Sequence, residues 1–469
     1  MTALLSLAGT AAAIAEGRTT SRAVVEACLA RIDARNAELG AFVALHRAAA
    51  LEEADAADRA VAAGAGLGPL HGVPLAHKDM YYQQDRPVTC GSLIRKDWVP
   101  GSTATVRRRL ADAGAIDLGA LAMVEFAMGP HGFNAHLPMS RNPWAADHVP
   151  CGSSSGSGIA VAAGFVPASL GSDTGGSVRC PASACGVTGL LPTNGRVSRH
   201  GVMPMSFSLD AVGPLARTAQ DCALMLQVIA GADPLDPACS TRAVPDYLAG
   251  LDAPLTGLRV GIPDSYFDAG ISDDVAAALE TALAALRDLG AVPVKVAIPP
   301  AIEAAADLHP LVMKAEGAAN HQAWMRRYPE LYTDEVRHRL QAGFFIPASD
   351  YIQALKLRAP LLAEFSAAVF GAADVLFTPV LPKAAPSMAD VHSRTGAAYL
   401  EMVVSLTRNT KPVNYLGLPA ISVPCGFTGA GLPVSFQLIG RPFDEATLLR
   451  AAHQYQQITD WHRRVPPCR

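Results

Sequence analysis

One lysine holds a position that suits acid–base chemistry. Lys78 ends the short apolar stretch GVPLAHK at 72–78, in a chain with only seven lysines. Burial disfavours the ammonium form, so a buried lysine can become a neutral amine that accepts a proton near neutral pH. Lys78 is therefore a candidate general base. The alternative is a lysine at a strand end that reaches solvent and pairs with Asp79.

A serine that follows two glycines offers a nucleophile and the groups to stabilise its reaction. The run GSDTGGS ends at Ser177, and Gly175 and Gly176 have no side chains that would keep a substrate carbonyl from the backbone. Backbone N–H groups in such a run can hold the oxyanion of an acyl-transfer intermediate. Asp173 and Arg179 flank the serine and can pair to brace the run. The alternative is an ordinary glycine turn with a surface serine and a solvated ion pair.

A run of three serines can connect these two groups. The stretch CGSSSGSG at 151–158 contains Ser153, Ser154 and Ser155. A hydroxyl both donates and accepts hydrogen bonds, so any of the three can pass a proton from Ser177 to Lys78. A flexible loop or a phosphate-binding loop is the alternative interpretation. Together, the three clusters indicate acyl transfer by a serine nucleophile.

Other nucleophile patterns fit less well. The glycines of CGSSSG satisfy GxSxG, which would make Ser154 the nucleophile, but Pro150 is unsuited to the central strand that must precede it. No serine stands three positions before a lysine, and GxxxxGK[ST] is absent. Cys151 and Cys180 lie near the serines and are alternative nucleophiles, although buried cysteines are more often small packing residues.

The sequence predicts neither a metal nor a cofactor. Its thirteen histidines show no HExxH spacing and its nine cysteines include no CxxC pair. His77, beside Lys78 in an expected strand, points to the opposite face, so we expect a structural role for it. An odd number of scattered cysteines favours reduced thiols, which are typical of a cytoplasmic protein.

Alternating strand and helix patterns must position these clusters. Residues 71–80, 115–121 and 166–170 are short apolar stretches typical of buried strands. Helical patterns occupy the intervening sequence, at 20–66, 107–113 and 159–165. Such alternation predicts an α/β fold, in which helices cover a sheet.

Helical patterns predominate in the second half of the chain. Long helical patterns at 273–289, 335–342 and 351–369 surround a single clear strand at 257–263. Two strand-like runs within 419–440 and an amphipathic helix from Asp444 follow. No linker rich in Pro, Gly or Ser divides the chain and no repeat is visible, so we expect one domain over 1–469.

Composition excludes several classes of partner. The net charge is −4, with 38 Lys and Arg against 42 Asp and Glu, which provides no field to attract nucleic acid or anionic lipid. No apolar run reaches the ~18 residues that a membrane span needs. The N-terminal stretch 1–17 lacks a basic residue ahead of its apolar part, so we expect mature structure there rather than a signal peptide.

The three clusters match the motifs of a known family. The chain resembles the amidase signature enzymes in GVPLAHKD at 72–79, CGSSSGSGIAVAAG at 151–164 and GSDTGGSVRCPASACGVTGLLPT at 171–193. In that family the lysine precedes a bridging serine by seventy-five positions and the nucleophile follows it by twenty-four, which selects Lys78, Ser153 and Ser177 here. The similarity continues through EFAMG at 125–129, RNPW at 141–144 and NYLGLPAISVPCG at 414–426, so it spans most of the chain.

The resemblance implies a catalytic role for each cluster. Ser177 attacks a carbonyl, and Ser153, which follows a cis peptide bond, passes the proton to neutral Lys78. The oxyanion is held by backbone N–H groups of four successive residues: Thr174, Gly175, Gly176 and Ser177. The resemblance also implies that Ser154 supports the substrate-binding network, and that Ala127 and Met128 line the pocket together with part of residues 300–360.

The resemblance implies a fold with a large mixed central β-sheet covered by helices on both faces. Residues 70–200 would form its signature core and 265–375 a more variable helical segment. The chain departs from the usual family pattern at Cys151 and Pro138, where glycine is common, and at His77, where an aliphatic residue is common. These departures affect the fine shape of the pocket and leave the triad intact.

The expected function is therefore that of a cofactor-independent amidase. It would hydrolyse the C–N bond of a small amide, an aryl amide or a carbamate, as a chain compatible with a homodimer. A glutaminase subunit of a tRNA-dependent amidotransferase comes second, because residues 321–345 lack the tyrosine- and glycine-rich pattern expected there. A non-catalytic binding protein comes third, since the Lys-Ser-Ser set is intact.

Overall fold

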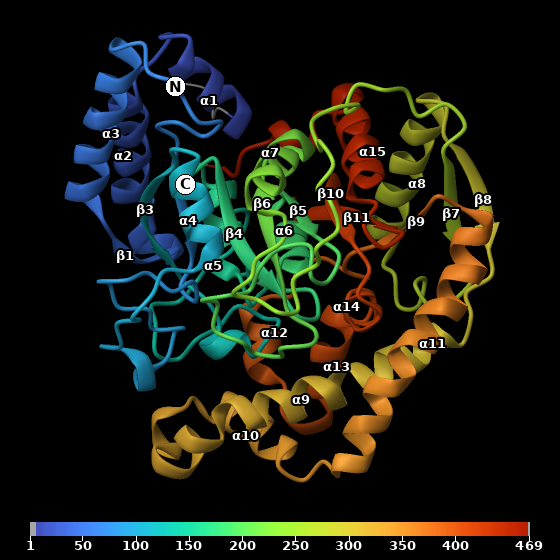
Figure 1. Ribbon diagram of the computed structural model, residues 1–469. Coiled ribbons are helices and arrows are strands. Elements are labelled where there is room, and N and C mark those ends of the chain that lie inside the picture. Colours follow the sequence, from blue (N-terminus) through green and yellow to red (C-terminus); the bar gives the residue numbers. More distant parts are fainter. Residues whose placement is uncertain (1–5, 468–469) are drawn as a thin grey trace.

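A mixed eight-stranded β-sheet forms the centre of the computed structural model, which describes residues 6–467 (Figure 1). Its strand order is β4-β6-β5-β10-β11-β9-β7-β8. The strands are β4 (Ala168–Asp173), β5 (Thr188–Leu191), β6 (Ala211–Ala216), β7 (Arg259–Pro263), β8 (Val292–Val296), β9 (Val375–Pro379), β10 (Ala420–Phe427) and β11 (Pro433–Gly440). Pairing is antiparallel from β4 to β9, and β7 pairs parallel with both β9 and β8.

Helices cover both faces of this sheet. Phe436 and Gln437 are neighbours on β11, so their side chains point to opposite faces. The Phe436 ring meets Tyr455 of α15 (Glu445–Ile458) at 5.0 Å between centroids, whereas Gln437 accepts a hydrogen bond from Arg179 of α6 (Arg179–Cys185). The α8 helix (Asp273–Asp288) also packs on β10 and β11, α7 (Ala219–Ile229) on β6, and α5 (Ser155–Ala162) on β4. The predicted mixed sheet with two covered faces is confirmed.

The strand that carries the candidate lysine belongs to a second, smaller sheet. This sheet has the order β1-β3-β2, with β1 (Phe42–Leu45), β2 (Pro74–Lys78) and β3 (Ile116–Leu121). Strand β2 lies against β4, where His77 Nδ1 accepts the N–H of Leu170 at 3.1 Å. Lys78 ends β2, and this contact brings it beside the edge strand of the large sheet.

The remaining helices form two groups at the ends of the molecule. One group lies near the small sheet: α1 (Leu7–Ala15), α2 (Ser21–Leu39), α3 (Arg47–Ala62) and α4 (Thr105–Asp112). The other lies below the large sheet in Figure 1: α9 (Ala301–Arg327), α10 (Asp334–Gly343), α11 (Ala348–Ala372), α12 (Met388–Ser393), α13 (Gly396–Thr407) and α14 (Lys411–Leu416). Of the N-terminal stretch expected to be mature structure, residues 7–15 form α1 and residues 1–5 lie outside the described part.

Two expectations about secondary structure were wrong. The helix expected over 20–66 is interrupted by β1, because Gly40 adopts φ 62 and ends α2, and Asn36 Oδ1 accepts the N–H groups of Ala41 and Phe42. The strand at 257–263 is not alone in its region, because β8 and β9 flank it. The run of β9 is buried throughout, so it lacks the polar alternation that reveals a half-exposed strand.

Candidate active site

Lys78 is the buried centre of the site. Its side chain is 1% exposed, and its Nζ lies 2.7 Å from Ser153 Oγ and 2.8 Å from Ser172 Oγ. Burial lowers the pKa of Lys78 to about 7, although Asp210 and Asp173 act to raise it. A large fraction of the amine is therefore neutral at pH 7, and it can donate to one hydroxyl while it accepts a proton from the other.

The peptide bond between Gly152 and Ser153 is cis, as the family resemblance implies. The loop that follows β3 contacts both sides of this bond. Gly152 N–H donates to the carbonyl of Pro130 at 2.7 Å, and the carbonyl of Ser153 accepts the N–H of Val124 at 3.2 Å. Ser153 is fully buried. Its hydroxyl is thus held at Lys78 by backbone contacts that do not involve the hydroxyl itself.

The hydroxyls of the other two serines, Ser154 and Ser155, form hydrogen bonds with the neighbouring backbone. The hydroxyl of Ser154 donates to the carbonyl of Ser172 and accepts its N–H, each at 3.3 Å, and Ser155 Oγ donates to the carbonyl of Ala122. A Cβ at Gly171 would lie 2.7 Å from Ser154 Oγ, so glycine is needed for this approach. Of the three candidate hydroxyls, only that of Ser153 contacts Lys78. The hydroxyl of Ser154 instead hydrogen-bonds the backbone of Ser172 in β4.

Ser177 lies between β4 and α6 and is partly exposed, whereas Lys78 and Ser153 are buried. A substrate can therefore reach its hydroxyl from solvent. Within residues 6–467, no hydrogen bond joins Ser177 Oγ to Ser153. Catalytic hydrogen bonds are often long in an unliganded enzyme, so this geometry does not remove Ser177 as a candidate nucleophile.

The backbone before Ser177 provides three open N–H groups rather than the expected four. Gly176 N–H donates to Asp173 Oδ1 at 2.6 Å, so it is already engaged. The N–H groups of Thr174, Gly175 and Ser177 have no acceptor among the described residues. Gly176 adopts φ 130, and a Cβ there would lie 2.4 Å from Thr410 Oγ1. This turn consequently requires glycine, and its free donors can face an oxyanion.

A buried ion pair fixes the loop. Arg179 and Asp173 pair at 3.1 Å with both side chains fully buried, and Asp173 also accepts from Asn414 Nδ2 at 2.9 Å. Burial acts to raise the pKa of Asp173, but Arg179 and Asn414 outweigh it and lower the pKa. Arg179 further donates to Gln437 and to the carbonyl of Thr410. The ion pair expected from the sequence is thus part of a network that joins the loop to the C-terminal strands.

Three residues that sequence reasoning missed brace Thr174 and Gly175. Asp210 accepts from Thr174 Oγ1 at 2.5 Å, His309 Nε2 donates to the carbonyl of Thr174 at 2.8 Å, and Thr410 Oγ1 donates to the carbonyl of Gly175 at 2.7 Å. Burial lowers the pKa of His309 to about 4, so the ring is neutral. These residues come from the turn before β6, from α9 and from the turn before α14, and no local pattern in the sequence marks them. Ser172 was also missed, although it lies within β4 two positions before Thr174.

The predicted pocket residues Ala127 and Met128 lie in a conformationally demanding loop. Phe126 and Ala127 adopt φ 46 and 63, which non-glycine residues rarely do. Met128 packs toward α9, where a Cβ at Gly317 would lie 3.2 Å from its terminal methyl group. Both predicted residues are buried, and other residues of the same loop contact the cis peptide.

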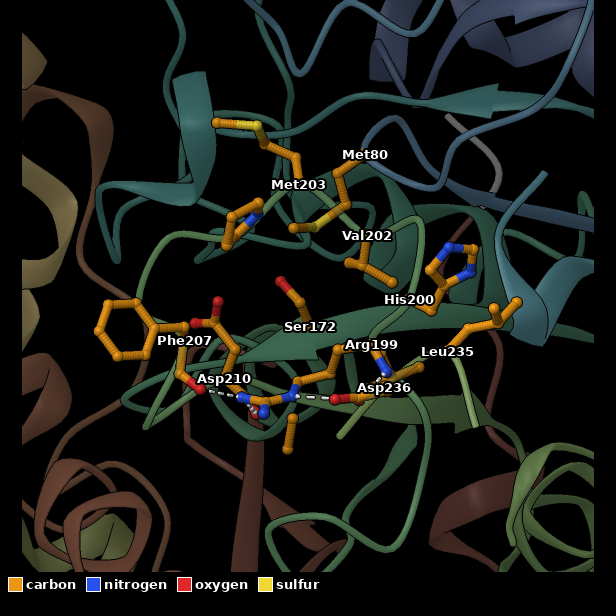
Figure 2. Close-up of a pocket in the computed structure, with 13 residues that line it drawn as sticks. Met80, Ser172, Arg199, His200, Val202, Met203, Phe207, Asp210, Leu235 and Asp236 are labelled. Atoms are coloured by element: carbon orange, nitrogen blue, oxygen red, sulfur yellow. Dashed lines mark hydrogen bonds and ion pairs between the residues drawn. The ribbon is translucent and has the colours of Figure 1, made fainter. Parts of the chain in front are cut away.

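A cavity of about 230 Å³ approaches the lysine from one side (Figure 2). Ser172 lies between Met80 and Met203 on one wall and Asp210 and Arg199 on the other. Ser177 is not among the residues that line it. The cavity therefore reaches the Ser172 side of Lys78.

The alternative nucleophiles are chemically unsuited to attack. Cys151 and Cys180 are fully buried, and burial raises the pKa of Cys180 to about 12 and that of Cys151 well above its usual value. Their thiolates are thus disfavoured. His77, with a pKa that burial lowers to about 3, is neutral and packs β2 against β4.

The described residues contain neither a metal-binding cluster nor a membrane-spanning helix. Within residues 6–467, no three His, Cys, Asp or Glu side chains come together in a way that could hold a metal ion. No helix in that range is long and apolar enough to cross a membrane.

Comparisons with known proteins show what the chain is similar to. The sequence model of the amidase family matches residues 23–449. A glutamyl-tRNA(Gln) amidotransferase subunit from Roseiflexus sp. (strain RS-1) is 42% identical, and the match covers 98% of each chain. A solved structure of a vestigial protein complex, described as revealing the evolutionary origins of an s-triazine catabolic enzyme, matches with TM-score 0.90 and 34% identity over 97% of this chain and 98% of that one. The peptide amidase of Stenotrophomonas maltophilia matches with TM-score 0.85 and 32% identity over 98% of each chain.

Proposed function

Since the chain belongs to the amidase family, we propose that it hydrolyses the C–N bond of a carboxylic amide through an acyl-enzyme on Ser177. The observation that carries this proposal is the 2.7 Å contact between the buried Lys78 amine and Ser153 Oγ. A lysine with a pKa of about 7 accepts a proton at physiological pH, which an ordinary lysine does not.

Each step of the reaction has a group to perform it. Ser177 Oγ attacks the carbonyl carbon, and its proton passes through Ser153 to Lys78. The open N–H groups of Thr174, Gly175 and Ser177 stabilise the oxyanion, and such donors are often the largest single contribution to acyl transfer. When the C–N bond breaks, the proton returns through Ser153 to the leaving nitrogen. Water then attacks the acyl-enzyme by the same route and releases the acid.

We place the side-chain amide of glutamine first among the substrates. The sequence alone ranked a glutaminase subunit second, but curated relatives with 41–43% identity over nearly the whole chain are named as subunits of glutamyl-tRNA(Gln) amidotransferase. In this role the chain would release ammonia from glutamine as one component of a larger assembly that acts on tRNA. The chain itself needs no basic surface for such a role, because another component can bind the nucleic acid.

Independent hydrolysis of a small amide is the second candidate. One observation favours it: the likeness to the peptide amidase, at TM-score 0.85 and 32% identity.

A turnover screen separates the two candidates. The purified chain is incubated with glutamine, aliphatic amides, anilides and carbamates, and release of ammonia or amine is measured against the Ser177→Ala variant. Turnover of glutamine alone supports the glutaminase, and turnover of the other amides without glutamine supports independent hydrolysis. Equal turnover by Ser177→Ala and the native chain on every substrate contradicts the proposed mechanism.

A further inference from the structure

A cluster of charged and polar side chains lies outside the proposed triad, where three separate parts of the fold meet. Glu335, in the first turn of α10, accepts a hydrogen bond from Tyr399 of α13 at 2.6 Å and lies 2.8 Å from His131 Nε2. Arg339, one turn further along α10, lies 3.8 Å from Glu335 and donates to the carbonyl of Met128 at 3.1 Å. One carboxylate thus joins α10, α13 and the loop that follows β3.

The hydrogen bonds of His131 define its orientation. Phe133 N–H donates to His131 Nδ1 at 3.0 Å, so Nδ1 is an acceptor and Nε2 carries the proton that it donates to Glu335. The His131 side chain is 3% exposed and that of Glu335 is 29% exposed. Burial acts to raise the pKa of Glu335, but His131, Arg339 and Tyr399 outweigh it and hold the pKa at about 2. Glu335 is therefore ionised throughout the physiological range.

The other side of the same loop holds the cis peptide. Pro130 and Val124 make the two backbone hydrogen bonds to Gly152 and Ser153 described above. The packing between these bonds is tight, because a Cβ at Gly132 would lie 2.7 Å from the carbonyl of Cys151 and one at Gly152 would lie 3.1 Å from the carbonyl of Gly129. A displacement of residues 129–132 must therefore move the segment 151–153.

A second carboxylate attaches the start of the loop to α10. Glu125 is fully buried, and it accepts from Thr333 N–H at 2.8 Å, from Thr333 Oγ1 at 2.7 Å and from Ser92 Oγ at 2.6 Å. Thr333 is the residue before α10. The loop is thus fastened to α10 at both ends, by Glu125 and by His131.

We propose that Glu335 is a positioning residue for the Ser153–Lys78 relay. It acts through His131: the carboxylate holds residues 129–132, and these residues hold Ser153 Oγ at Lys78 Nζ. Tyr399 donates a hydrogen bond to Glu335, so the position of α13 also affects how Glu335 is held. The inference rests on the proposed function, because it assigns Glu335 a role in a relay that serves Ser177.

The test uses a probe that does not depend on the amide substrate. A fluorophosphonate reacts with an activated serine: the Oγ–P bond forms at Ser177, the P–F bond breaks, fluoride leaves, and the proton passes to Lys78. The labelling rate of the full chain is measured from pH 5 to 10, with the melting temperature, for the native chain, Glu335→Gln and Asp334→Asn. Asp334 is the matched control, since it precedes Glu335 in the same helical turn, loses the same charge and is 81% exposed.

We expect Glu335→Gln to label at least tenfold more slowly than the native chain at pH 7, with the midpoint of its pH profile moved to higher pH. Glutamine has one carbonyl oxygen where the carboxylate used two, so either His131 or Tyr399 loses its acceptor. A looser loop admits water to Lys78 and weakens the burial that lowers its pKa. The groups that act on Lys78 electrostatically are unchanged in both variants: Asp210, Asp173 and Cys90. Asp334→Asn should stay within twofold of the native chain.

Three outcomes are distinguishable. A Glu335→Gln profile with the native midpoint and a rate within twofold of Asp334→Asn overturns the positioning role, whatever its melting temperature. A native chain that is not labelled at Ser177 at all contradicts the proposed function instead. If Glu335→Gln does not fold, Tyr399→Phe takes its place, because it keeps the charge and the His131 contact. A labelling rate at least threefold below the native one then supports the role of Glu335, and an unchanged rate overturns it.

Discussion

The amine of Lys78 and the hydroxyl of Ser153 lie 2.7 Å apart, although seventy-five positions separate them in the chain. Lys78 ends a strand of the small sheet, and Ser153 follows a cis peptide that the neighbouring loop holds. The hydrogen bond gives each of these two buried polar groups a partner, and a buried polar group without a partner costs about 1–3 kcal/mol of stability. The contact is therefore both the core of the proposed relay and a condition for burying the lysine.

Removal of either end of the relay should abolish turnover. We expect Ser177→Ala to lower kcat on the order of 10⁴-fold or more, and Lys78→Ala to lower it ~10²–10⁴-fold, the range that general base catalysis supplies. Initial rates on the best amide from the turnover screen measure both effects. Lys356→Ala, which removes an exposed lysine of α11, is the control and should retain native activity. An active Ser177→Ala variant would remove Ser177 as the nucleophile.

Activity should rise with pH through about 7. Lys78 must be neutral to accept the proton of Ser177, and burial lowers its pKa to about 7. The rate should consequently fall about tenfold for each pH unit below that value and level off above it. A pH profile of kcat/KM between pH 5 and 10 measures this dependence. A rate that is flat over the whole range, with chemistry rate-limiting, speaks against a lysine base.

Replacement of Lys78 by an apolar residue should stabilise the fold near pH 7 while it removes activity. The folded pKa is lowered relative to the unfolded chain, so the unfolded state binds more protons between about pH 7 and 10, and native stability rises with pH over that interval. Lys78→Met should be more stable than the native chain by on the order of 1–3 kcal/mol at pH 7, a value reduced by the lost hydrogen bonds. Urea unfolding at pH 7 and pH 10 tests this, and the advantage should shrink at pH 10. An advantage that grows from pH 7 to pH 10 has the wrong sign.

The buried ion pair under the glycine loop should matter far more for stability than an exposed one. Arg179→Ala leaves Asp173 buried without its partner and should cost about 3–5 kcal/mol. Arg259→Ala breaks the pair with Asp374, in which Arg259 is 41% exposed, and should cost less than about 1 kcal/mol. Denaturant unfolding of both variants measures the difference. Equal costs would contradict a structural role for the buried pair.

The glycine that precedes Ser177 should not tolerate a side chain. Gly176 adopts φ 130, and its Cβ would lie 2.4 Å from Thr410 Oγ1 and 2.7 Å from Cys180 Sγ. Gly176→Ala should therefore displace the loop and lower kcat by about a hundredfold or more, as loss of oxyanion stabilisation does. Gly429→Ala is the control, because nothing lies within 4 Å of a Cβ there. Comparable activity in the two variants would show that the loop geometry is not required.

Local sequence patterns were sufficient to locate many of the helices and strands. Apolar stretches bounded by glycine and proline located β2, β3 and β4, and helical periodicity located α8, α10 and α11. Five strands were not predicted: β1, β5, β6, β8 and β9. For β1 and β9 the reasons are clear and differ. Strand β1 is short and lies between two helices without a breaker stronger than Gly40. Strand β9 is buried throughout, so it has no alternation of buried and exposed residues.

The amino-acid sequence by itself determined which chemical groups the site contains and the glycines that let a substrate approach them. Motif spacing selected Lys78, Ser153 and Ser177, and the cis peptide was expected from the family that these motifs indicate. Such features are visible without the fold, because they depend only on residue type and on position along the chain.

Only the tertiary structure decided which N–H groups remain open and which residues support the loop. Asp210, His309 and Thr410 come from distant elements, and their contacts with Thr174 and Gly175 exist only once the sheet, α9 and the C-terminal segment have packed together. The lowered pKa of Lys78 has the same origin. A lysine in an unfolded chain is solvated and charged, and burial by the folded core is what makes it a base.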